Sequence, residues 1–561
     1  MTSASTNIAR HLPAMARRQP QRAALKIPRG RDSREGTIDY LTLSFADLDA
    51  EVNAWVQKLA DRGVRRGDRV LVMVKQGLPL IASVFALFKM GAVPVVIDPG
   101  MGLRSFLRCV GHSRPRVLLG IPLARLISRM ARSAFATVEV RVTASSRATQ
   151  RLLPAGRSSP LANDPTVETP ADELAAILFT SGSTGAPKGV CYTHGMFDAQ
   201  VQGIRQTYDI QPGEIDLPLL PIFALFNPAL GMTTIVPEID PRRPAAMDPA
   251  KIVQALLQEN VTTSFGSPTL WRKIGDFAQE HGVAFPKLKR VLCAGAPVPP
   301  SLWTASTLFL PSGQLHSPYG ATEALPVSTI STGEVLAETA TATRRGAGTC
   351  VGRAISGVEI RILPISDEPI ATWEETFVLP TGEIGEIVVK GAAVTRTYDA
   401  LPDATARAKI PVEAKGNARG PTSEAGAVWH RMGDCGYLDR QGRLWFCGRK
   451  VERVVMATGT LFTEQVEPIF NQHPRVKRSA LVGVGVSGEQ RPWVIIELKP
   501  DSRPSDALKA EILSWARDQP HDVNLSSVAG VLFHPAFPVD VRHNAKIHRL
   551  TLSKWAAKQL K

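Results

Sequence analysis

The chain has 561 residues, a formal net charge of +15 and a hydrophobic fraction of 44%. This length is sufficient for several domains with large buried cores, and no apolar run reaches the roughly 18 residues that a membrane helix needs. The N-terminus lacks a charged segment followed by an apolar core, so we expect no signal peptide and a cytoplasmic protein. The six cysteines are scattered without a Cys-x-x-Cys pair, which argues against a zinc site or a disulfide framework.

The positive charge favours anionic ligands, but it does not choose among nucleotides, nucleic acids, acidic lipids and acidic proteins. No basic motif is interleaved with aromatic residues in the manner of RNA-binding modules, so we expect no nucleic-acid partner.

Between residues 43 and 99, predicted strands alternate with predicted helices. Strands are predicted over 69–74 and 92–99, and the apolar segment 81–90 between them predicts a buried helix that Gly91 ends. This alternation implies a parallel sheet with helices on both of its faces.

The segment 122–157 is strongly basic. A helix is predicted over 122–136, with arginines off an apolar stripe that consists of Leu123, Leu126, Ile127 and Met130. Two interpretations stay open: a solvated helix face followed by a loop, or a docking surface for an acidic membrane or a protein partner.

The stretch 180–189 combines four small hydroxyl side chains, three glycines and a lysine between two predicted strands. Backbone N–H groups at glycines, hydroxyl groups and a lysine ammonium are the donors that surround phosphate oxygens. The predicted phosphate-binding residues are Thr180, Ser181, Gly182, Ser183, Thr184, Gly185 and Lys188. Because Pro187 precedes the lysine and a strand rather than a helix follows, a P-loop kinase is disfavoured.

Three further motifs follow in the first part of the chain. The segment 217–227 is apolar and interrupted by prolines, and the strand near 291 runs into a tight turn at Gly295, Ala296 and Pro297. The third motif consists of Tyr319, Gly320, Ala321, Thr322 and Glu323. A hydroxyl beside a carboxylate after a glycine suits a Mg²⁺–phosphate site, because Mg²⁺ prefers hard oxygen ligands.

The C-terminal part begins after a small β-subdomain. The alternating segment 381–391 predicts a strand of this subdomain, and the Pro/Ala/Gly-rich segment 401–427 predicts a surface insertion. The motif 444–450 marks a boundary, which gives an N-terminal domain of 1–449 and a C-terminal domain of 450–561. The predicted fold class is α/β: a large domain of mostly parallel sheets with flanking helices and the β-subdomain, and a small mobile α/β domain.

The sequence motif Thr-Ser-Gly-Ser-Thr-Gly-x-Pro-Lys-Gly resembles the signature of the adenylate-forming superfamily, and the later motifs follow it in the order typical of that superfamily. This superfamily includes acyl-CoA synthetases, luciferases and the adenylation domains of peptide synthetases. The resemblance implies that the loop and Lys188 hold the β- and γ-phosphates of ATP. It also implies that Thr322 and Glu323 hold Mg²⁺ and the α-phosphate, with Glu323 as the metal ligand.

The same resemblance assigns roles to residues that local pattern does not explain. It places the turn Gly295–Pro297 and the segment Tyr319–Ala321 at the nucleotide, and Asp434 and Arg449 at the ribose. Lys546 matches the catalytic lysine, which bridges the substrate carboxylate and the phosphate. Phe223 and Phe226 match walls of the acyl pocket, although plain core aromatic residues are an equal interpretation.

The chain departs from the general superfamily pattern at Ala224, Met432, Val451 and Ala545. The segments 223–226, 430–434, 444–450 and 537–546 instead resemble the olefin β-lactone synthetase subgroup of bacterial long-chain olefin biosynthesis. This implies ATP-dependent adenylation of a 2-alkyl-3-hydroxy fatty acid, followed by attack of its own β-hydroxyl to give a β-lactone, AMP and pyrophosphate.

Several alternatives remain open at this stage. A long-chain acyl-CoA synthetase or a fatty acyl-AMP ligase would share most of these motifs. His543 is either a base for the hydroxyl or a surface residue. A non-catalytic scaffold on acidic membranes is disfavoured because Lys188, Glu323, Asp434 and Lys546 are all present. The subgroup also implies a complex with pathway enzymes.

Overall fold

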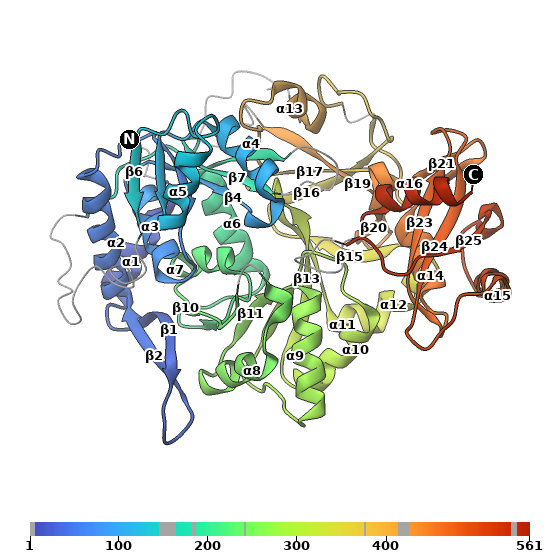
Figure 1. Ribbon diagram of the computed structural model, residues 1–561, viewed down its shortest axis with the longest axis horizontal. Coiled ribbons are helices and arrows are strands. Elements are labelled where there is room, and N and C mark those ends of the chain that lie inside the picture. The colour runs from blue at the N-terminus through green and yellow to red at the C-terminus, as the bar shows by residue number, and fades with distance from the viewer. Residues whose placement is uncertain are drawn as a thin grey trace.

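The structure is a computed structural model that describes residues 6–144, 164–180, 187–240, 243–374, 377–412, 427–539 and 547–560. Figure 1 shows a large body built from the first four-fifths of the chain and a smaller C-terminal part, coloured orange to red, at one side. The fold class is mixed α/β, with a large sheet-rich N-terminal domain and a smaller C-terminal domain, as the sequence predicts.

The first sheet has six strands in the order β6-β5-β3-β4-β7-β8. All neighbours are parallel except β7 and β8, which are antiparallel. The strands are β3 (Arg69–Met73), β4 (Val93–Ile97), β5 (Val117–Gly120), β6 (Val140–Thr143), β7 (Leu174–Thr180) and β8 (Lys188–Thr193). Their helices are α2 (Phe45–Ala60), α3 (Leu78–Lys89), α4 (Leu103–Ser113), α5 (Pro122–Met130) and α6 (His194–Thr207).

The second sheet runs in the order β16-β17-β19-β20-β15-β14-β13-β12-β11-β9-β10-β1-β2, with β18 paired to β19. Its parallel part contains β1 (Ala23–Arg31), β9 (Ile215–Asp216), β10 (Thr233–Ile235), β11 (Thr263–Gly266), β12 (Arg290–Cys293) and β13 (Gln314–Ala321). The antiparallel strands are β2 (Ile38–Ser44), β14 (Ala324–Ser331), β15 (Thr349–Ala354), β16 (Val358–Leu363), β17 (Gly385–Gly391), β18 (Lys409–Pro411), β19 (Val428–Leu438) and β20 (Leu444–Arg449).

The remaining helices of the large body cover this second sheet or join its strands (Figure 1). They are α1 (His11–Arg18), α7 (Asn227–Leu230), α8 (Pro249–Gln258), α9 (Pro268–Glu280), α10 (Pro300–Phe309), α11 (Thr332–Glu334), α12 (Ala340–Arg344) and α13 (Pro402–Ala408). No helix among the described residues is long and apolar enough to cross a membrane.

The C-terminal part has its own buried cluster, whose members lie between Val454 and Val531. It contains β21 (Val454–Met456), β22 (Gly459–Leu461), β23 (Val476–Val484), β24 (Arg491–Leu498), β25 (Gly530–Phe533), α14 (Thr463–Phe470), α15 (Asp506–Asp518) and α16 (Arg549–Gln559). The short 3-10 helix Lys450–Glu452 joins it to β20. The boundary between residues 449 and 450 stays a prediction.

Two local expectations were wrong. The segment 401–427 was expected to be a surface insertion, but α13 and β18 belong to the folded body, and Lys409 and Ile410 are buried because β18 pairs with β19. Residues 413–426 lie outside the described residues. The helix expected over 122–136 ends at Met130; of its apolar stripe, Ile127 is half-buried, whereas Leu123, Leu126 and Met130 are exposed.

Candidate active site

The β13–β14 hairpin carries Thr322 and Glu323 at its tip. Ala321 pairs with Ala324 across the turn, and a register shift lies between Tyr319 and Ala321. A Cβ on Gly320 would lie 2.4 Å from the Ala324 carbonyl oxygen, so this bulge requires glycine. Gly320 lies in β13, and the hairpin turn follows at Thr322 and Glu323.

Both sheets anchor this tip. The Tyr192 hydroxyl on β8 donates to the Thr322 carbonyl oxygen. From the other side, the N–H and the hydroxyl of Thr395 donate to the Glu323 carbonyl oxygen at 2.9 and 3.1 Å. The predicted Mg²⁺–phosphate motif is therefore fixed where the two sheets meet, and its backbone is oriented before any ligand binds.

A buried cluster of charges surrounds the Glu323 carboxylate. The Tyr398 hydroxyl donates to Glu323 Oε1 at 2.6 Å, and the Lys188 and Lys409 ammonium groups lie 4.8 and 5.8 Å from the centre of the Tyr398 ring. Burial alone would raise the pKa of Glu323, but His430, the Tyr398 hydrogen bond and Lys409 outweigh it and the pKa is lowered. Glu323 is thus an ionised carboxylate near neutral pH.

Lys409 is the member of this cluster that the sequence did not reveal. Its side chain is 3% exposed, and its ammonium group donates to the carbonyl and hydroxyl oxygens of Thr395 at 2.5 and 3.2 Å. Burial lowers its pKa to about 7, with Glu323 opposing and Lys188 adding to the shift. Its neighbour His430 is also buried, and burial lowers the pKa of that imidazole to about 3.

Asp434 and Arg449 face each other on adjacent strands, as the predicted ribose site requires. They pair directly in the register of β19 and β20, and Arg449 Nη1 lies 2.9 Å from Asp434 Oδ1. The Tyr319 hydroxyl donates to Asp434 Oδ2 at 2.5 Å. The charge of Asp434 raises the pKa of Arg449, so this pair is ionised.

The expected nucleotide turn follows β12. Gly295 has φ +96°, a conformation that favours glycine, and it is exposed together with Pro297, whereas Ala296 is half-buried. Because β12 and β13 are parallel neighbours, the turn and the β13–β14 hairpin leave the same edge of the sheet. The two motifs, which the sequence separates by some twenty residues, meet on one side of the molecule.

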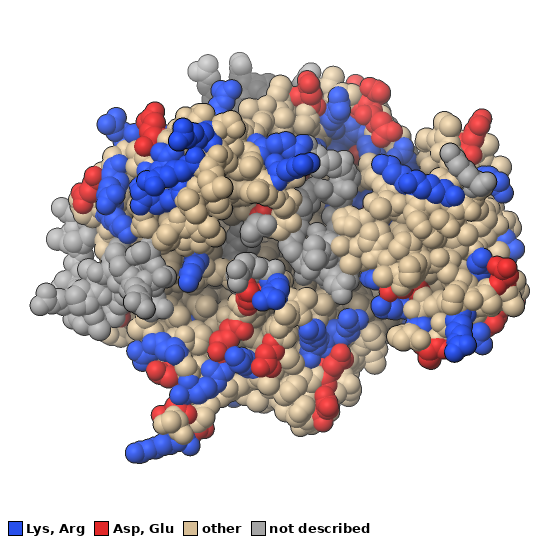
Figure 2. Space-filling view, viewed as in Figure 1, with Lys and Arg blue, Asp and Glu red and all other residues tan. Residues whose placement is uncertain are grey.

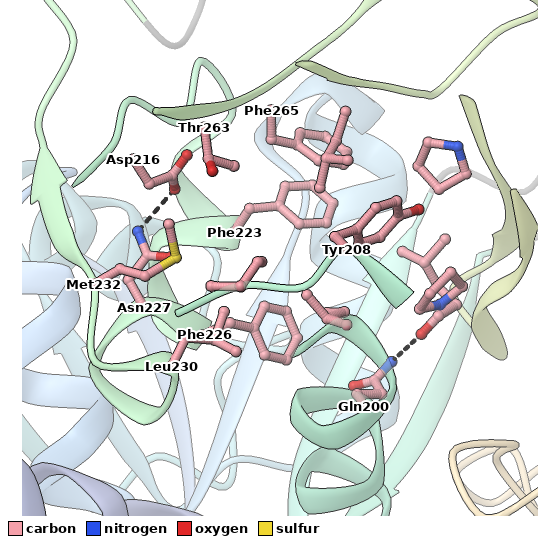
Figure 3. A pocket seen from close by; sticks show the side chains of 16 residues that line it. Gln200, Tyr208, Asp216, Phe223, Phe226, Asn227, Leu230, Met232, Thr263 and Phe265 are labelled. Carbon is pink, nitrogen blue, oxygen red and sulfur yellow. Dashed lines mark hydrogen bonds between the residues drawn. The ribbon is translucent and has the colours of Figure 1, made fainter. Parts of the chain in front are cut away.

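An apolar cavity of about 60 Å³ lies behind the hairpin. Figure 3 shows Phe223 and Phe265 with stacked rings and Phe226 below them, and the centres of the two stacked rings are 3.6 Å apart. Pro318, Leu325 and Pro326 contribute to the wall, so the hairpin that holds Glu323 also borders the cavity. Phe223 and Phe226 therefore line a cavity, as the acyl-pocket interpretation requires.

Two polar side chains of this cavity were not predicted. Asp216 is 5% exposed, and Asn227 Nδ2 donates to its Oδ2 at 2.8 Å. Among the described residues, Asp216 Oδ1 has no hydrogen-bond partner. Burial raises the pKa of this carboxyl to about 7. Sequence pattern gave no signal for it, because one aspartate at the end of a short strand resembles any surface carboxylate.

Several predicted residues cannot be located. Ser181, Gly182, Ser183, Thr184, Gly185 and Lys546 lie outside the described residues, and Thr180 is described by its backbone alone, as the last residue of β7. Lys188 begins β8 and is exposed at the edge of the cluster around Glu323. The roles of all these residues stay predictions.

Comparison with known proteins identifies the chain. A family model described as AMP-binding enzyme matches residues 12–399. An olefin beta-lactone synthetase from Xanthomonas campestris pv. campestris is 45% identical over 557 residues, which cover 99% of this chain and 98% of the relative. A second one, from Stenotrophomonas maltophilia, is 44% identical over 563 residues, with the same two coverages of 99% and 98%.

This chain belongs to the AMP-binding enzyme family. Solved structures agree on the fold of this AMP-binding enzyme. The amide bond synthetase McbA from Marinactinospora thermotolerans has a TM-score of 0.74 at 21% identity, over 98% of this chain and 99% of that one. ATP-bound MatB from Rhodopseudomonas palustris has a TM-score of 0.74 at 20% identity, over 99% and 100%. At these identities the likeness shows the fold alone.

The described residues of this AMP-binding enzyme fit a magnesium nucleotide. The ionised Glu323 carboxylate supplies a hard oxygen ligand, and the ion pair of Asp434 and Arg449 supplies acceptors and donors for a sugar. The exposed Lys188 ammonium at the same edge supplies positive charge for phosphate oxygens.

Proposed function

We propose that the protein uses ATP to adenylate a 2-alkyl-3-hydroxy long-chain fatty acid and then closes the activated acid to a β-lactone. The observation that carries this proposal is the 45% identity to an olefin beta-lactone synthetase over 99% of the chain. The hairpin geometry supports it, because residues of the apolar cavity wall and the predicted metal ligand belong to the same β-hairpin.

In the first step, a carboxylate oxygen of the acid attacks the α-phosphorus of ATP, and the bond to pyrophosphate breaks. Lys188 and the loop 180–185 hold the β- and γ-phosphates, and Thr322 and Glu323 hold the α-phosphate and Mg²⁺. Bound Mg²⁺ neutralises part of the triphosphate charge. The turn at Gly295 lies along the adenine, Asp434 and Arg449 fix the ribose, and Lys546 bridges carboxylate and phosphate.

In the second step, the β-hydroxyl oxygen attacks the acyl carbon and the bond from that carbon to AMP breaks. The hydroxyl proton passes to a base, and the product is a four-membered lactone. The nucleophile is already attached to the substrate, so its effective concentration is high and no coenzyme A is needed. The cavity walls formed by Phe223 and Phe226 hold the alkyl chains.

The decisive experiment compares two acids that differ in one hydroxyl group. With ATP and Mg²⁺ but no coenzyme A, we expect the 2-alkyl-3-hydroxy acid to yield β-lactone and AMP. The matched 2-alkyl acid without the hydroxyl should yield acyl-adenylate and no lactone. If the hydroxy acid gives only acyl-adenylate, and a thioester once coenzyme A is added, the protein is instead an acyl-CoA synthetase.

The acyl-CoA synthetase alternative is supported by a more distant relative. A feruloyl-CoA synthase from Amycolatopsis is 28% identical over 509 residues, which cover 89% of this chain. An acyl-adenylate that persists in the presence of coenzyme A would indicate the third possibility, a fatty acyl-AMP ligase.

The role of Lys546 is tested by comparison with a lysine of the same domain. We expect Lys546→Ala to lower the adenylation rate by about 10²–10³, the usual effect of removing one group that stabilises developing charge. Lys554→Ala, which changes an exposed lysine on α16, is the control and should leave the rate unchanged. Equal rates in both variants would contradict the proposed role.

A further inference from the structure

The helix α5 exposes most of its large apolar side chains to solvent, with Ile127 half-buried. Against the sheet it buries two small side chains, Ala124 and Ser128, at 0% and 1% exposure. Its large apolar residues Leu123, Leu126 and Met130 are 57%, 54% and 79% exposed. Their spacing of three and four residues puts them on one face of the helix. This is the reverse of an ordinary surface helix, whose apolar stripe faces the core.

The surroundings of this face are positively charged. Residues 101–144 contain eight arginines and one acidic residue, Glu139. Figure 2 shows blue side chains gathered over the region of α4 and α5. Some of these arginines have partners: Arg116 pairs with Glu139 and Asp68. Within the described residues, the exposed Arg129 and Arg132 make no ion pair, so their charge is available to a ligand.

We propose that the α5 patch, which consists of Leu123, Leu126, Met130, Arg129 and Arg132, docks the protein on an anionic lipid surface. A helix of this kind lies in the membrane interface, with its apolar side chains among the acyl chains and its arginines at the headgroups. Each basic side chain near such a surface adds attraction to acidic lipid.

A second protein fits the patch less well than a membrane does. Two copies of this chain would bring arginines against arginines, which repel. Three exposed side chains on one short helix also fall short of the roughly 800 Å² per partner that a stable protein interface buries. A membrane interface has no such threshold, because insertion energy grows with each buried apolar group.

The test measures co-sedimentation of the full-length protein with lipid vesicles. We expect partition onto phosphatidylcholine mixed with phosphatidylglycerol to exceed partition onto phosphatidylcholine alone by about tenfold, and to weaken as salt is added. Leu126→Glu with Met130→Glu should abolish binding to both. Arg129→Glu with Arg132→Glu should remove the preference for the anionic vesicles.

Matched controls come from two helices beside the second sheet, α9 and α10. Leu308→Glu changes a leucine that is 65% exposed on α10, and Arg272→Glu changes an exposed arginine on α9. Both should bind vesicles as the wild type does. All substituted side chains are on the surface, and equal thermal midpoints show that each variant is folded.

Three results would overturn the proposal: no vesicle binding by the wild type, equal binding to the two kinds of vesicle, or variants of the patch that bind like the controls. Adenylation of an acid dissolved in detergent, measured in parallel, should be the same in all variants. If the wild type does not adenylate the acid, the proposed function is refuted. The docking result is unaffected, because co-sedimentation needs no substrate.

Discussion

Lys409 is a buried lysine that is separated from the predicted metal ligand Glu323 by the side chain of Tyr398. Its ammonium group helps to keep the pKa of Glu323 low, together with His430 and Tyr398. We expect Lys409→Met to raise that pKa, so the acidic limb of the adenylation pH profile should move up by about one unit. At acidic pH, below the pKa of Glu323, the rate should fall by up to about tenfold, and it should recover to the wild-type rate as the pH is raised to neutral.

The control for this variant is Lys287→Met, which removes an exposed lysine at a distance from the cluster. The pH profile separates the electrostatic role from a structural one, because a misfolded site would lose rate equally at every pH. An unshifted acidic limb in Lys409→Met would refute the link between Lys409 and Glu323.

Asp216 makes stability depend on pH in a predictable direction. Its pKa is about 7 in the folded protein and its ordinary value is 3.8, so between these values only the unfolded chain is ionised. The contribution of this group to stability is complete below the ordinary value and is lost as the pH rises through the folded value. We expect Asp216→Asn to remove this loss, because an asparagine oxygen still accepts from Asn227.

The measurement is denaturant unfolding of wild type and Asp216→Asn from pH 4 to pH 8. Relative to the wild type, the free energy of unfolding of the variant should rise by about 3–4 kcal/mol between pH 4 and pH 8. This is the largest effect that a pKa shift of this size can have over that range. Asp276→Asn, an exposed change on α9, controls for replacing a carboxylate by an amide. If the difference in free energy of unfolding between Asp216→Asn and the wild type does not change with pH, this carboxyl is not the titrating group.

The same residues show how far sequence can predict a site. Glu323 was expected from the residue types around it, and Asp434 and Arg449 from the family resemblance; the structure brings Asp434 and Arg449 together across two strands. Lys409 and Asp216 lie in stretches without such a pattern. Their importance comes from burial, which depends on strand pairing far along the chain and has no local signal.

At the scale of elements, the β13–β14 hairpin sets the position of Thr322 and Glu323. We expect Gly320→Ala to force the hairpin apart, because the new Cβ would lie 2.4 Å from the Ala324 carbonyl oxygen. Overpacking of this kind costs about 1–3 kcal/mol of stability. Adenylation should fall at least about tenfold, since displacement of a positioned ligand lowers rate steeply.

Gly333→Ala is the matched control for this hairpin variant. Gly333 follows β14 on α11, and a Cβ there would lie 3.5 Å from its nearest neighbour, the Gln314 side chain, which is ordinary contact. The control should keep both its melting temperature and its activity. Full adenylation activity in Gly320→Ala would show that the hairpin is not a rigid support of the site.

The helix α5 illustrates where element-level prediction fails. The helical periodicity of Leu123, Leu126 and Met130 is present in the structure, but the predicted helix over 122–136 ends at Met130, and these three side chains are exposed. Periodicity reports that one face of a helix differs from the other; it does not report which face meets the sheet. Here the sheet receives the small residues Ala124 and Ser128, which allow close packing.

At the scale of the whole molecule, the alternation of strands and helices was sufficient to predict a mixed α/β fold with a smaller C-terminal part. The predicted strands over 69–74 and 92–99 correspond to β3 and β4. The predicted helix over 81–90 corresponds to α3, which begins three residues earlier and ends one residue earlier. The sequence could not predict that the second sheet continues from the parallel part into the β-subdomain, because this depends on pairing between β14 and β15.

One partly buried hydrogen bond joins the two parts of the molecule. The Thr349 hydroxyl on β15 donates to Glu464 Oε2 on α14 at 2.7 Å. Glu464 is buried, and both burial and the nearby Glu467 raise its pKa. We expect Thr349→Val to leave this carboxyl without its donor, at a cost of about 1–3 kcal/mol. Hydrogen exchange in α14 and β20 should then quicken by about tenfold or more.

Glu464→Gln is the control that keeps the bond, because a glutamine oxygen also accepts from the Thr349 hydroxyl. Exchange in this variant should stay near that of the wild type. If Lys546 reaches the nucleotide from the C-terminal part, as proposed, loosening the contact should alter adenylation in Thr349→Val and leave Glu464→Gln unaffected. If neither hydrogen exchange nor the adenylation rate changes in Thr349→Val, contacts other than this hydrogen bond hold the two parts together.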